Sequence, residues 1–144
     1  MPNTTYDGRE ISPDPPFGAS IVAYRRRTDL IEFLILHRAE RGSSYEGDWA
    51  WTPPAGARWP GEHPDQCAQR ELREETGLTT PVQHTDHGTA DWLVYRTEIP
   101  LGTSITLDAE HDRYAWLNVQ QACARCAPVQ VAAQIRAIAR ELDL

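Results

Sequence analysis

The sequence predicts an α/β fold in which a mixed β-sheet lies between helices. Two observations support this prediction. Short runs of β-branched, aliphatic and aromatic residues occur along the chain, as strands require, and other segments repeat apolar residues at helical spacing. Strand runs interleaved with helical segments are typical of a sheet covered by helices on both faces. The 144 residues are enough for one such domain.

The first part of the chain is expected to contain a leader and a strand pair. Residues 1–16 are polar and include four prolines, so we expect a flexible leader followed by one domain over residues 17–144. Ala19–Tyr24 and Ile31–Leu36 have the composition of paired strands, and the second is apolar enough to be central. Trp49–Ala55 contains two adjacent prolines, which predict a stiff, extended connection.

A helix is expected to begin just after Glu62 and to end at Gly77, because glycine suits the left-handed conformation that closes many helices. Beyond it, the pattern predicts further strands and two more helices. The expected strands are Pro81–Thr89 and Asp91–Ile99, joined by a turn at Gly88, a short stretch Ser104–Leu107, and Arg113–Leu117. The expected helices follow Asn118 and include Val131, Ile135, Ile138 and Leu142.

Composition narrows the possible partners. The 21 acidic and 14 basic residues give a net charge of −7, which disfavours duplex nucleic acid and anionic membranes. No apolar run approaches the roughly twenty residues of a membrane span. We therefore expect a soluble, cytoplasmic protein, either a monomer or a homodimer. All basic residues are arginines, which excludes Schiff-base and P-loop chemistry because both require lysine.

The three cysteines are expected to be reduced, because their number is odd and no signal peptide precedes them. Cys123 and Cys126 could form half of a zinc or redox motif. However, no second pair at zinc spacing follows, and both lie on an apolar helical stripe with Val119 and Ala122. We therefore expect them to pack a helix.

The segment Gly56–Leu78 carries the most chemical information. Helical geometry places Glu71, Glu74 and Glu75 on one face, where three carboxylates repel one another unless a cation compensates. Oxygen ligands without His or Cys favour Mg²⁺ or Mn²⁺ and phosphate chemistry. Arg70 lies four residues before Glu74 and can clamp a carboxylate through two hydrogen bonds. Considered without its flanking residues, the segment Arg70–Glu75 could instead be part of a solvent-exposed helix with surface ion pairs and no metal site.

The same segment fits the Nudix box, G-x5-E-x7-R-E-U-x-E-E-x-G-U with U aliphatic, at every specified position. The matching residues are Gly56, Glu62, Arg70, Glu71, Leu72, Glu74, Glu75, Gly77 and Leu78. The chain therefore resembles the Nudix hydrolases. This resemblance implies a Nudix-type α/β/α sandwich, a Mg²⁺ (or Mn²⁺) cofactor, and hydrolysis of a phosphoanhydride bond in a nucleoside diphosphate linked to another moiety.

The resemblance also assigns residues. Glu71, Glu74 and Glu75 are implied as metal ligands together with the backbone carbonyl of Ala55, and Glu62 as an outer-shell or additional ligand. The general base stays open between the box glutamates and Glu110, which precedes a late strand. Arg38, just after the second strand, is a candidate for binding phosphates.

Within the family, the sequence looks similar to the asymmetrical diadenosine tetraphosphate hydrolases. The resemblance lies in Ile31–Leu36, Trp51–Pro54 and Glu110–Leu117. It implies a small-molecule nucleotide substrate, with Trp51 and Tyr95 as candidates for stacking on adenine. One departure is Ala57-Arg58 after the box glycine, where the animal enzymes have His-Val. The alternatives are a housecleaning nucleoside triphosphate pyrophosphatase, a sugar or ribose diphosphate hydrolase, and a catalytically silent nucleotide-sensing module.

Overall fold

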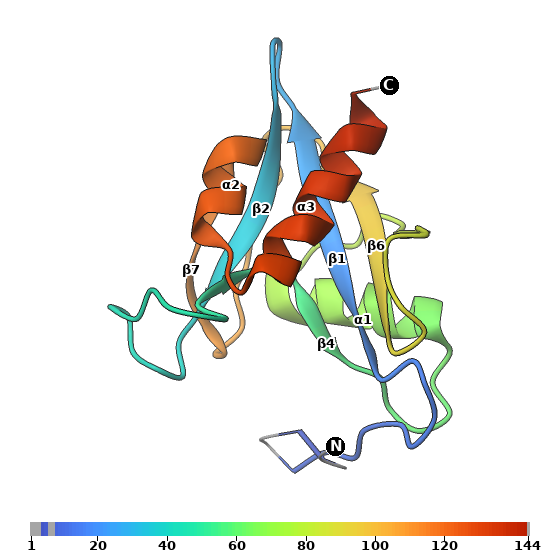
Figure 1. The fold of residues 1–144 in the computed structure, drawn as a ribbon. Coiled ribbons are helices and arrows are strands. Elements are labelled where there is room, and N and C mark those ends of the chain that lie inside the picture. The colour runs from blue at the N-terminus through green and yellow to red at the C-terminus, as the bar shows by residue number, and fades with distance from the viewer. Residues whose placement is uncertain (1–3, 6–7, 144) are drawn as a thin grey trace.

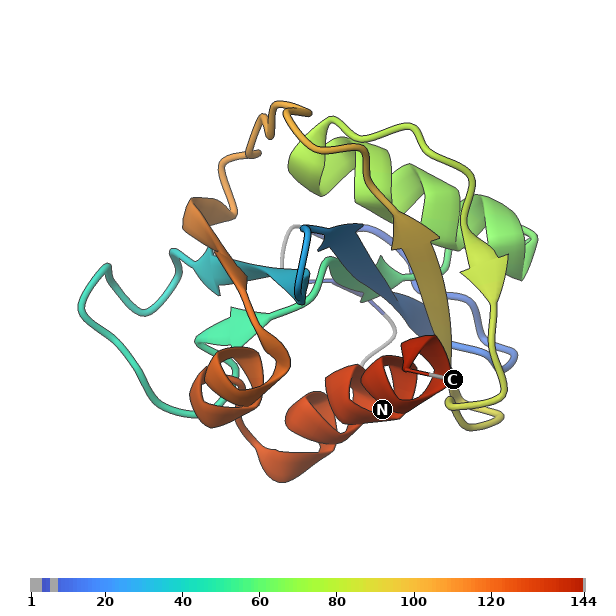
Figure 2. The same ribbon diagram turned by 90° about the horizontal axis from the view of Figure 1, so that it is seen from above.

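The structure is a computed structural model that describes residues 4–5 and 8–143. Its three layers are visible in Figure 1, where helices α2 (Val119–Arg125) and α3 (Val129–Leu142) lie in front of the sheet and α1 (Pro64–Thr76) lies behind it. Figure 2 shows the same layers from above, with the strands between the two sets of helices. This arrangement confirms the predicted α/β/α sandwich. Within the described ranges, no helix is long and apolar enough to cross a membrane.

The sheet of the described chain is mixed. Its strands are β1 (Gly18–Arg26), β2 (Ile31–Arg38), β3 (Trp51–Thr52), β4 (Ala55–Ala57), β5 (Gln83–His84), β6 (Trp92–Glu98) and β7 (His111–Leu117). Strand β1 pairs in parallel with β6, whereas β2 pairs antiparallel with both β1 and β7. The predicted hairpin of β1 and β2 is confirmed, and β2 is central and largely buried.

The sheet splits between β1 and β2, and this split positions the Nudix box. The two strands pair directly only near their hairpin, from Tyr24 with Phe33 to Arg26 with Ile31. Further along, β4 pairs with the start of β1 and β3 pairs with the end of β2. Strands β3 and β4 therefore occupy the gap between the diverging strands, and the residues that follow β4 lead directly into α1.

Helix α1 begins and ends where the sequence predicts. Its N-cap is His63, whose side chain accepts a hydrogen bond from the Asp65 backbone N–H, and Pro64 is the first helical residue. At the other end, Gly77 has a φ of 75° and its N–H donates to the Arg73 carbonyl. Leu72 is fully buried against the sheet, so the acidic side chains turn toward β4 and solvent.

Two hydrophobic cores hold the layers together. The core on the α1 side includes Ile21, Leu34 and Leu72, and the core on the side of α2 and α3 includes Val22 and Ile35. Adjacent residues of one strand thus enter different cores, as expected because successive side chains of a strand point to opposite faces. All three cysteines are free, and Cys126 is buried in the second core, in agreement with the predicted packing role.

Two strand predictions need correction. Ser104–Leu107 is not a strand: the Thr106 backbone N–H donates to the Thr76 carbonyl at the end of α1, and the neighbouring apolar side chains pack into the core without a strand partner. The strand predicted over Pro81–Thr89 is reduced to Gln83–His84. Gly88 explains part of this shortening, because its backbone lies so close to Trp92 that a Cβ there would be 2.5 Å from the Trp92 carbonyl oxygen.

The segment before β1 contacts the domain, although the sequence predicted a flexible leader. Ser12 is buried, and its backbone N–H donates to the Arg58 carbonyl. The Arg58 guanidinium in turn donates to the Pro16 carbonyl and to the Ser12 hydroxyl. The described part of the segment is therefore fastened to Arg58, two residues after the glycine that begins the box.

Candidate functional site

Helix α1 and the loop before β7 enclose a cavity of about 510 Å³, which we call the acidic cavity. Its carboxylates come from both elements, and its floor is the backbone of β4. The residues that line it are Thr5, Arg9, Arg38, Ala39, Glu40, Ala55, Gly56, Ala57, Trp59, Glu71, Glu74, Glu75, Asp108, Ala109, Glu110 and His111. Of the expected metal ligands, Glu71, Glu74, Glu75 and Ala55 line this cavity, and the candidate base Glu110 does so too.

Gly56 lets α1 approach β4 closely enough to bring its carboxylates to the sheet. A Cβ at Gly56 would lie 2.1 Å from Cδ of Glu71, far inside ordinary contact. The next carboxylate on the helix, Glu75, accepts a hydrogen bond of 3.2 Å from the Ala55 backbone N–H. The first specified position of the Nudix box is therefore glycine because a side chain there would occupy the place of the Glu71 carboxylate.

Glu71 and Glu75 form a buried pair. Burial raises the pKa of Glu71, although hydrogen bonds from Glu75 and Arg70 counteract this rise. Burial and the contact with Glu71 raise the pKa of Glu75 well above its usual range. The two adjacent buried negative charges repel each other, which makes this pair a place where positive charge is favoured.

Arg70 organises the carboxylates, but not in the way that the sequence predicted. Its bidentate partner is Glu62, with contacts of 2.8 Å from Nε and 2.9 Å from Nη2. Nη1 makes single contacts of 2.8 Å to Glu71 and 3.2 Å to Glu74. Burial alone would lower the pKa of Arg70, but these carboxylates raise it, so the guanidinium stays charged.

Glu62 was expected to be an outer-shell or an additional metal ligand, and in this geometry it lies behind Arg70. Glu62 does not line the acidic cavity, and both of its oxygens accept hydrogen bonds from Arg70. The Trp59 backbone N–H also donates to it, at 3.1 Å. Burial would raise the pKa of Glu62, yet these hydrogen bonds hold it below its usual value. Glu62 thus orients Arg70, which in turn orients Glu71.

The loop before β7 supplies a second polar group. Possible metal-binding atoms of Asp108, Glu110 and His111 all lie within 4.8 Å of one another, and among the described residues this compact set does not include the box glutamates. Glu74, with 41% of its side chain exposed, extends toward Arg70 and solvent. His111 is buried, contacts Asp108 at 2.8 Å and lies 3.8 Å from Glu75.

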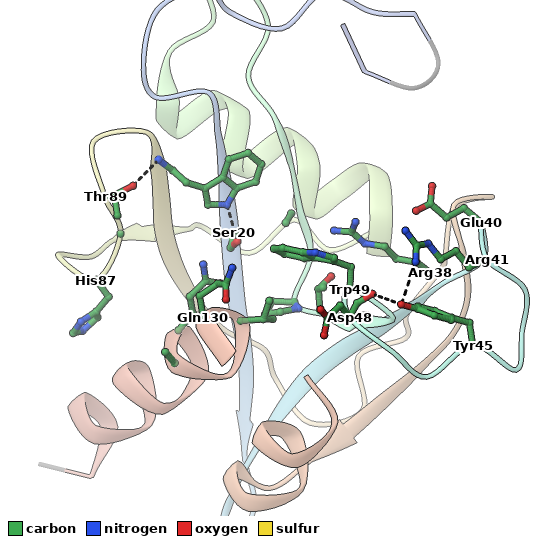
Figure 3. A pocket seen from close by; sticks show the side chains of 18 residues that line it. Ser20, Arg38, Glu40, Arg41, Tyr45, Asp48, Trp49, His87, Thr89 and Gln130 are labelled. Atoms are coloured by element: carbon green, nitrogen blue, oxygen red, sulfur yellow. Dashed lines mark hydrogen bonds between the residues drawn. The ribbon is translucent and has the colours of Figure 1, made fainter. Parts of the chain in front are cut away.

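A second cavity, of about 740 Å³, lies on the α3 side of the sheet, and we call it the large cavity. It shares Arg38, Glu40 and Ala55 with the acidic cavity, so the two are contiguous. Arg38 is therefore at the junction, where the sequence expectation of a phosphate contact is physically possible. Figure 3 shows Trp49 in the middle of the large cavity, between Ser20 and Gln130 on one side and the arginines on the other.

Two expected substrate-binding residues lie elsewhere. Trp51 is only 3% exposed, and its indole N–H donates to Glu46. Tyr95 is only 1% exposed, and its hydroxyl donates to Asp65 at 2.5 Å. Neither side chain lines either cavity, because strand alternation turns both into the cores. The expectation that they stack on the base is therefore corrected.

The sequence reasoning missed Trp49, which is the exposed tryptophan beside Trp51. It is 44% exposed and lines the large cavity. Its φ of 67° is unusual for a residue with a side chain, and such conformations cluster at functional sites. The guanidinium of Arg38 lies 5.9 Å from the centre of its ring. Residues two apart on a regular strand share a face, so the positive φ of Trp49, which precedes β3, is what separates its ring from that of Trp51.

The donors of the acidic cavity fit a hard divalent cation. Carboxylate oxygens predominate at the helix, which is the ligand type that Mg²⁺ and Mn²⁺ prefer. The Glu71 and Glu75 pair supports this fit, because two buried carboxylates in contact are stabilised by a cation between them.

An acidic helix held against a split mixed sheet in an α/β/α sandwich defines a Nudix-type domain. Comparison with known families agrees: the family model of the NUDIX domain matches residues 14–142. The chain therefore belongs to the Nudix family. The domain match and the curated relatives together support a Nudix hydrolase that acts on nucleoside polyphosphates.

The relatives that this chain resembles carry the names of different enzymes. The asymmetrical bis(5'-nucleosyl)-tetraphosphatase of Mus musculus is 34% identical over 106 residues, which cover 65% of this chain and 68% of the mouse protein. An octanoyltransferase of Myxococcus xanthus is 29% identical over 85% of this chain, but the match spans only 36% of that protein. The Ap4A hydrolase of C. elegans in a binary complex has a TM-score of 0.70 at 22% identity, covering 88% of this chain and 96% of that one.

Proposed function

We propose that the chain hydrolyses a phosphoanhydride bond in a nucleoside diphosphate linked to another moiety, and that it requires Mg²⁺ or Mn²⁺. The observation that carries this proposal is that two different cavities share Arg38 and Ala55 in their walls. One cavity offers carboxylates for cations, and the other offers an exposed indole for a base. A nucleotide whose phosphates extend from the large cavity into the acidic cavity would use both.

Glu71, Glu74 and Glu75 would hold the cations, together with the carbonyl of Ala55. When bound, the cations neutralise charge that develops on the leaving phosphate and lower the pKa of an attacking water. Arg70 positions Glu71 and Glu74 through its Nη1 contacts. Catalytic groups held this way lose little entropy on reaching the reactive geometry.

The proton of the attacking water needs an accepting carboxylate. Glu71 and Glu75 are buried, and they accept hydrogen bonds from Arg70 and from the Ala55 backbone respectively. Glu74 and Glu110 line the same cavity and are exposed, so each is a candidate general base. Glu110→Gln separates the two, because loss of a base that holds no cation lowers kcat without weakening metal binding, whereas Glu74→Gln would also remove a metal ligand.

Among possible substrates, diadenosine polyphosphate is the one we propose first. The similarity to the mouse tetraphosphatase supports it. The large cavity supports it too, because the Trp49 ring can stack on a nucleobase and the cavity volume lies in the range of small-molecule sites. A protein of this kind needs no nucleic-acid or membrane partner.

The test is turnover of a panel of nucleoside polyphosphates, nucleoside triphosphates and nucleotide sugars with Mg²⁺. Wild type is compared with Glu74→Gln and with Glu98→Gln, a control at an exposed glutamate that pairs with Arg26 at the far hairpin. We expect Glu74→Gln to lose at least about 100-fold in kcat, since it removes a charge beside the reacting phosphate. Glu98→Gln should match wild type.

Equal turnover by wild type and Glu74→Gln would refute the role of this glutamate. Fastest turnover of a nucleoside triphosphate, with release of pyrophosphate, would favour the housecleaning pyrophosphatase over the diadenosine polyphosphate hydrolase. Binding of nucleotides without turnover of any of them would favour the nucleotide-sensing module. Hydrolysis in ¹⁸O-labelled water then shows which phosphorus is attacked, because the label stays on the fragment that received the water.

A further inference from the structure

The described residues before β1 form an arm that packs on the domain, and Arg58 is its anchor. We call Thr4–Thr5 and Gly8–Phe17 the N-terminal arm; in Figure 1 it runs below β4. Arg58 is only 8% exposed. Its guanidinium donates to the carbonyls of Pro16 and Asp14, at 2.7 and 2.9 Å, and to the Ser12 hydroxyl at 2.9 Å. A buried arginine with this many partners holds its segment firmly.

The anchor is reinforced through the backbone. The Ser12 N–H donates to the Arg58 carbonyl at 2.7 Å, and the Arg58 N–H donates to the Phe17 carbonyl at 2.8 Å. The remaining guanidinium nitrogen donates to the Glu62 carbonyl at 2.6 Å. Glu62 is the residue whose side chain orients Arg70, so the arm and the catalytic helix are fastened to the same short connection.

The arm reaches the acidic cavity beyond this anchor. It turns back on itself, with the Thr5 N–H donating to the Arg9 carbonyl at 2.7 Å, and both residues line the cavity. The Arg9 guanidinium lies 5.2 Å from the centre of the Trp59 ring, and the Arg70 guanidinium lies 4.1 Å from the same ring. One indole therefore connects the arm to the arginine that positions the carboxylates.

The distribution of arginines around the cavities suggests a role for Arg9. Among the described residues that line the acidic cavity, the arginines are Arg9 and Arg38. Arg38 also lines the large cavity, whereas Arg9 lines the acidic cavity alone. A phosphate chain that enters from the large cavity would therefore meet Arg38 first, then the carboxylate-bound cations, and Arg9 last.

From this arrangement we infer that the N-terminal arm is a wall of the active site and that Arg9 binds the phosphates farthest from the nucleoside. The inference rests on the proposed function, because it takes the substrate to be a nucleoside polyphosphate. Arg58 is then a positioning residue that acts through the arm. Arg9 would make the site favour longer phosphate chains, since a guanidinium recognises a phosphate through charge-assisted hydrogen bonds.

The first test compares kinetics on adenosine diphosphate, triphosphate and tetraphosphate. For Arg9→Ala we expect KM to rise about fivefold to tenfold on the tetraphosphate and progressively less on shorter chains, with kcat unchanged, because an exposed charge contributes binding alone. Arg9→Lys should recover part of the loss. Arg140→Ala removes an exposed arginine of α3 that does not line the acidic cavity, and it should match wild type.

The second test examines the anchor. Arg58→Ala should raise KM on the tetraphosphate as Arg9→Ala does, and the double variant should add little, because both changes remove the same contact. Trypsin should cleave the wild-type chain slowly after Arg9. It should cleave the Arg58→Ala variant much faster at the same place, because the released arm becomes accessible. Arg9 is exposed, so its variants remain informative if Arg58→Ala fails to fold.

A third measurement separates this inference from the proposed function. Inorganic tripolyphosphate is titrated calorimetrically into the full chain in excess Mg²⁺, which requires no turnover. Weaker binding by Arg9→Ala than by Arg140→Ala supports the inference even if every nucleotide of the panel is left intact. Equal binding by these two variants, or a KM effect that does not depend on phosphate number, overturns it.

Discussion

Replacing Gly56 by alanine tests how the fold places the Glu71 carboxylate. The added Cβ would lie 2.1 Å from Cδ of Glu71 and 2.3 Å from each of its oxygens, whereas non-bonded carbon atoms approach to about 3.5 Å. The carboxylate must therefore move by roughly 1.5 Å. Such a movement would break its 2.8 Å contact with Arg70. The backbone at Gly56 has no positive φ, so the side-chain clash is the whole perturbation.

The expected effect is larger on activity than on stability. Overpacking a buried contact costs about 1–3 kcal/mol, which lowers the melting temperature of a domain this size by about 3–10 °C. A displacement of about 1 Å at a catalytic group costs about 100-fold in rate. We therefore expect the kcat of Gly56→Ala to fall at least about 100-fold. We also expect that Mg²⁺ will not raise the melting temperature of this variant as it does for wild type.

Gly61→Ala is the matched control within the Nudix box. Gly61 has a φ of 76° and no atom within 4 Å of an added Cβ, so alanine there costs backbone strain of about 1–2 kcal/mol without touching a carboxylate. Thermal unfolding with and without Mg²⁺, together with turnover, distinguishes the two variants. If Gly56→Ala keeps wild-type turnover and the full Mg²⁺ shift, the box glycine is not required to make room for the Glu71 carboxylate.

Three further predictions concern residues whose roles the fold decides. Trp51→Ala should lower the free energy of unfolding by about 3–5 kcal/mol, measured in urea, and should leave KM unchanged. Trp49→Ala should raise KM with little loss of stability. The reverse pattern would contradict the positions assigned to the two residues. Tyr95→Phe should lower the free energy of unfolding by about 1 kcal/mol, because the hydrogen bond to Asp65 is lost, and it should not change KM. A rise in KM would instead show that the hydroxyl binds substrate. Burial raises the pKa of the Cys126 thiol to about 12, so at pH 8 about one thiol in ten thousand is ionised. Iodoacetamide should therefore label Cys126 only after denaturation, and mass spectrometry that finds rapid labelling of the folded chain would refute its burial.

The local pattern was sufficient to predict the helix that carries the glutamates. A proline-containing turn before Asp65 and a glycine at position 77 mark the ends of α1, and both ends lie where the sequence places them. Capping and helical periodicity depend on neighbouring residues alone, so they can be read without knowledge of the fold. The strand predicted at Ser104–Leu107 failed for the complementary reason: a strand needs a partner, and its backbone bonds to the end of α1 instead.

The partners of Arg70 show where local reasoning ends for the site. Spacing along the helix correctly brought it within reach of Glu74, at 3.2 Å. Its bidentate partner, Glu62, lies eight residues earlier, before the helix begins, and is brought to Arg70 by the turn between β4 and α1. Trp49 and Trp51 pose the same difficulty, because their spacing alone would place both rings on one face of a strand, and only the positive φ at Trp49 before β3 separates them.

By itself the sequence determined the family, the sandwich of helices and sheet, and the acidic face of one helix, because these follow from residue spacing within short segments. The tertiary structure alone decided that β3 and β4 lie between the diverging β1 and β2. It also decided that the two cavities meet at Arg38 and that Arg58 fastens the N-terminal arm beside the acidic cavity. These features join residues far apart in the chain, and only the packing of the whole domain brings such residues together.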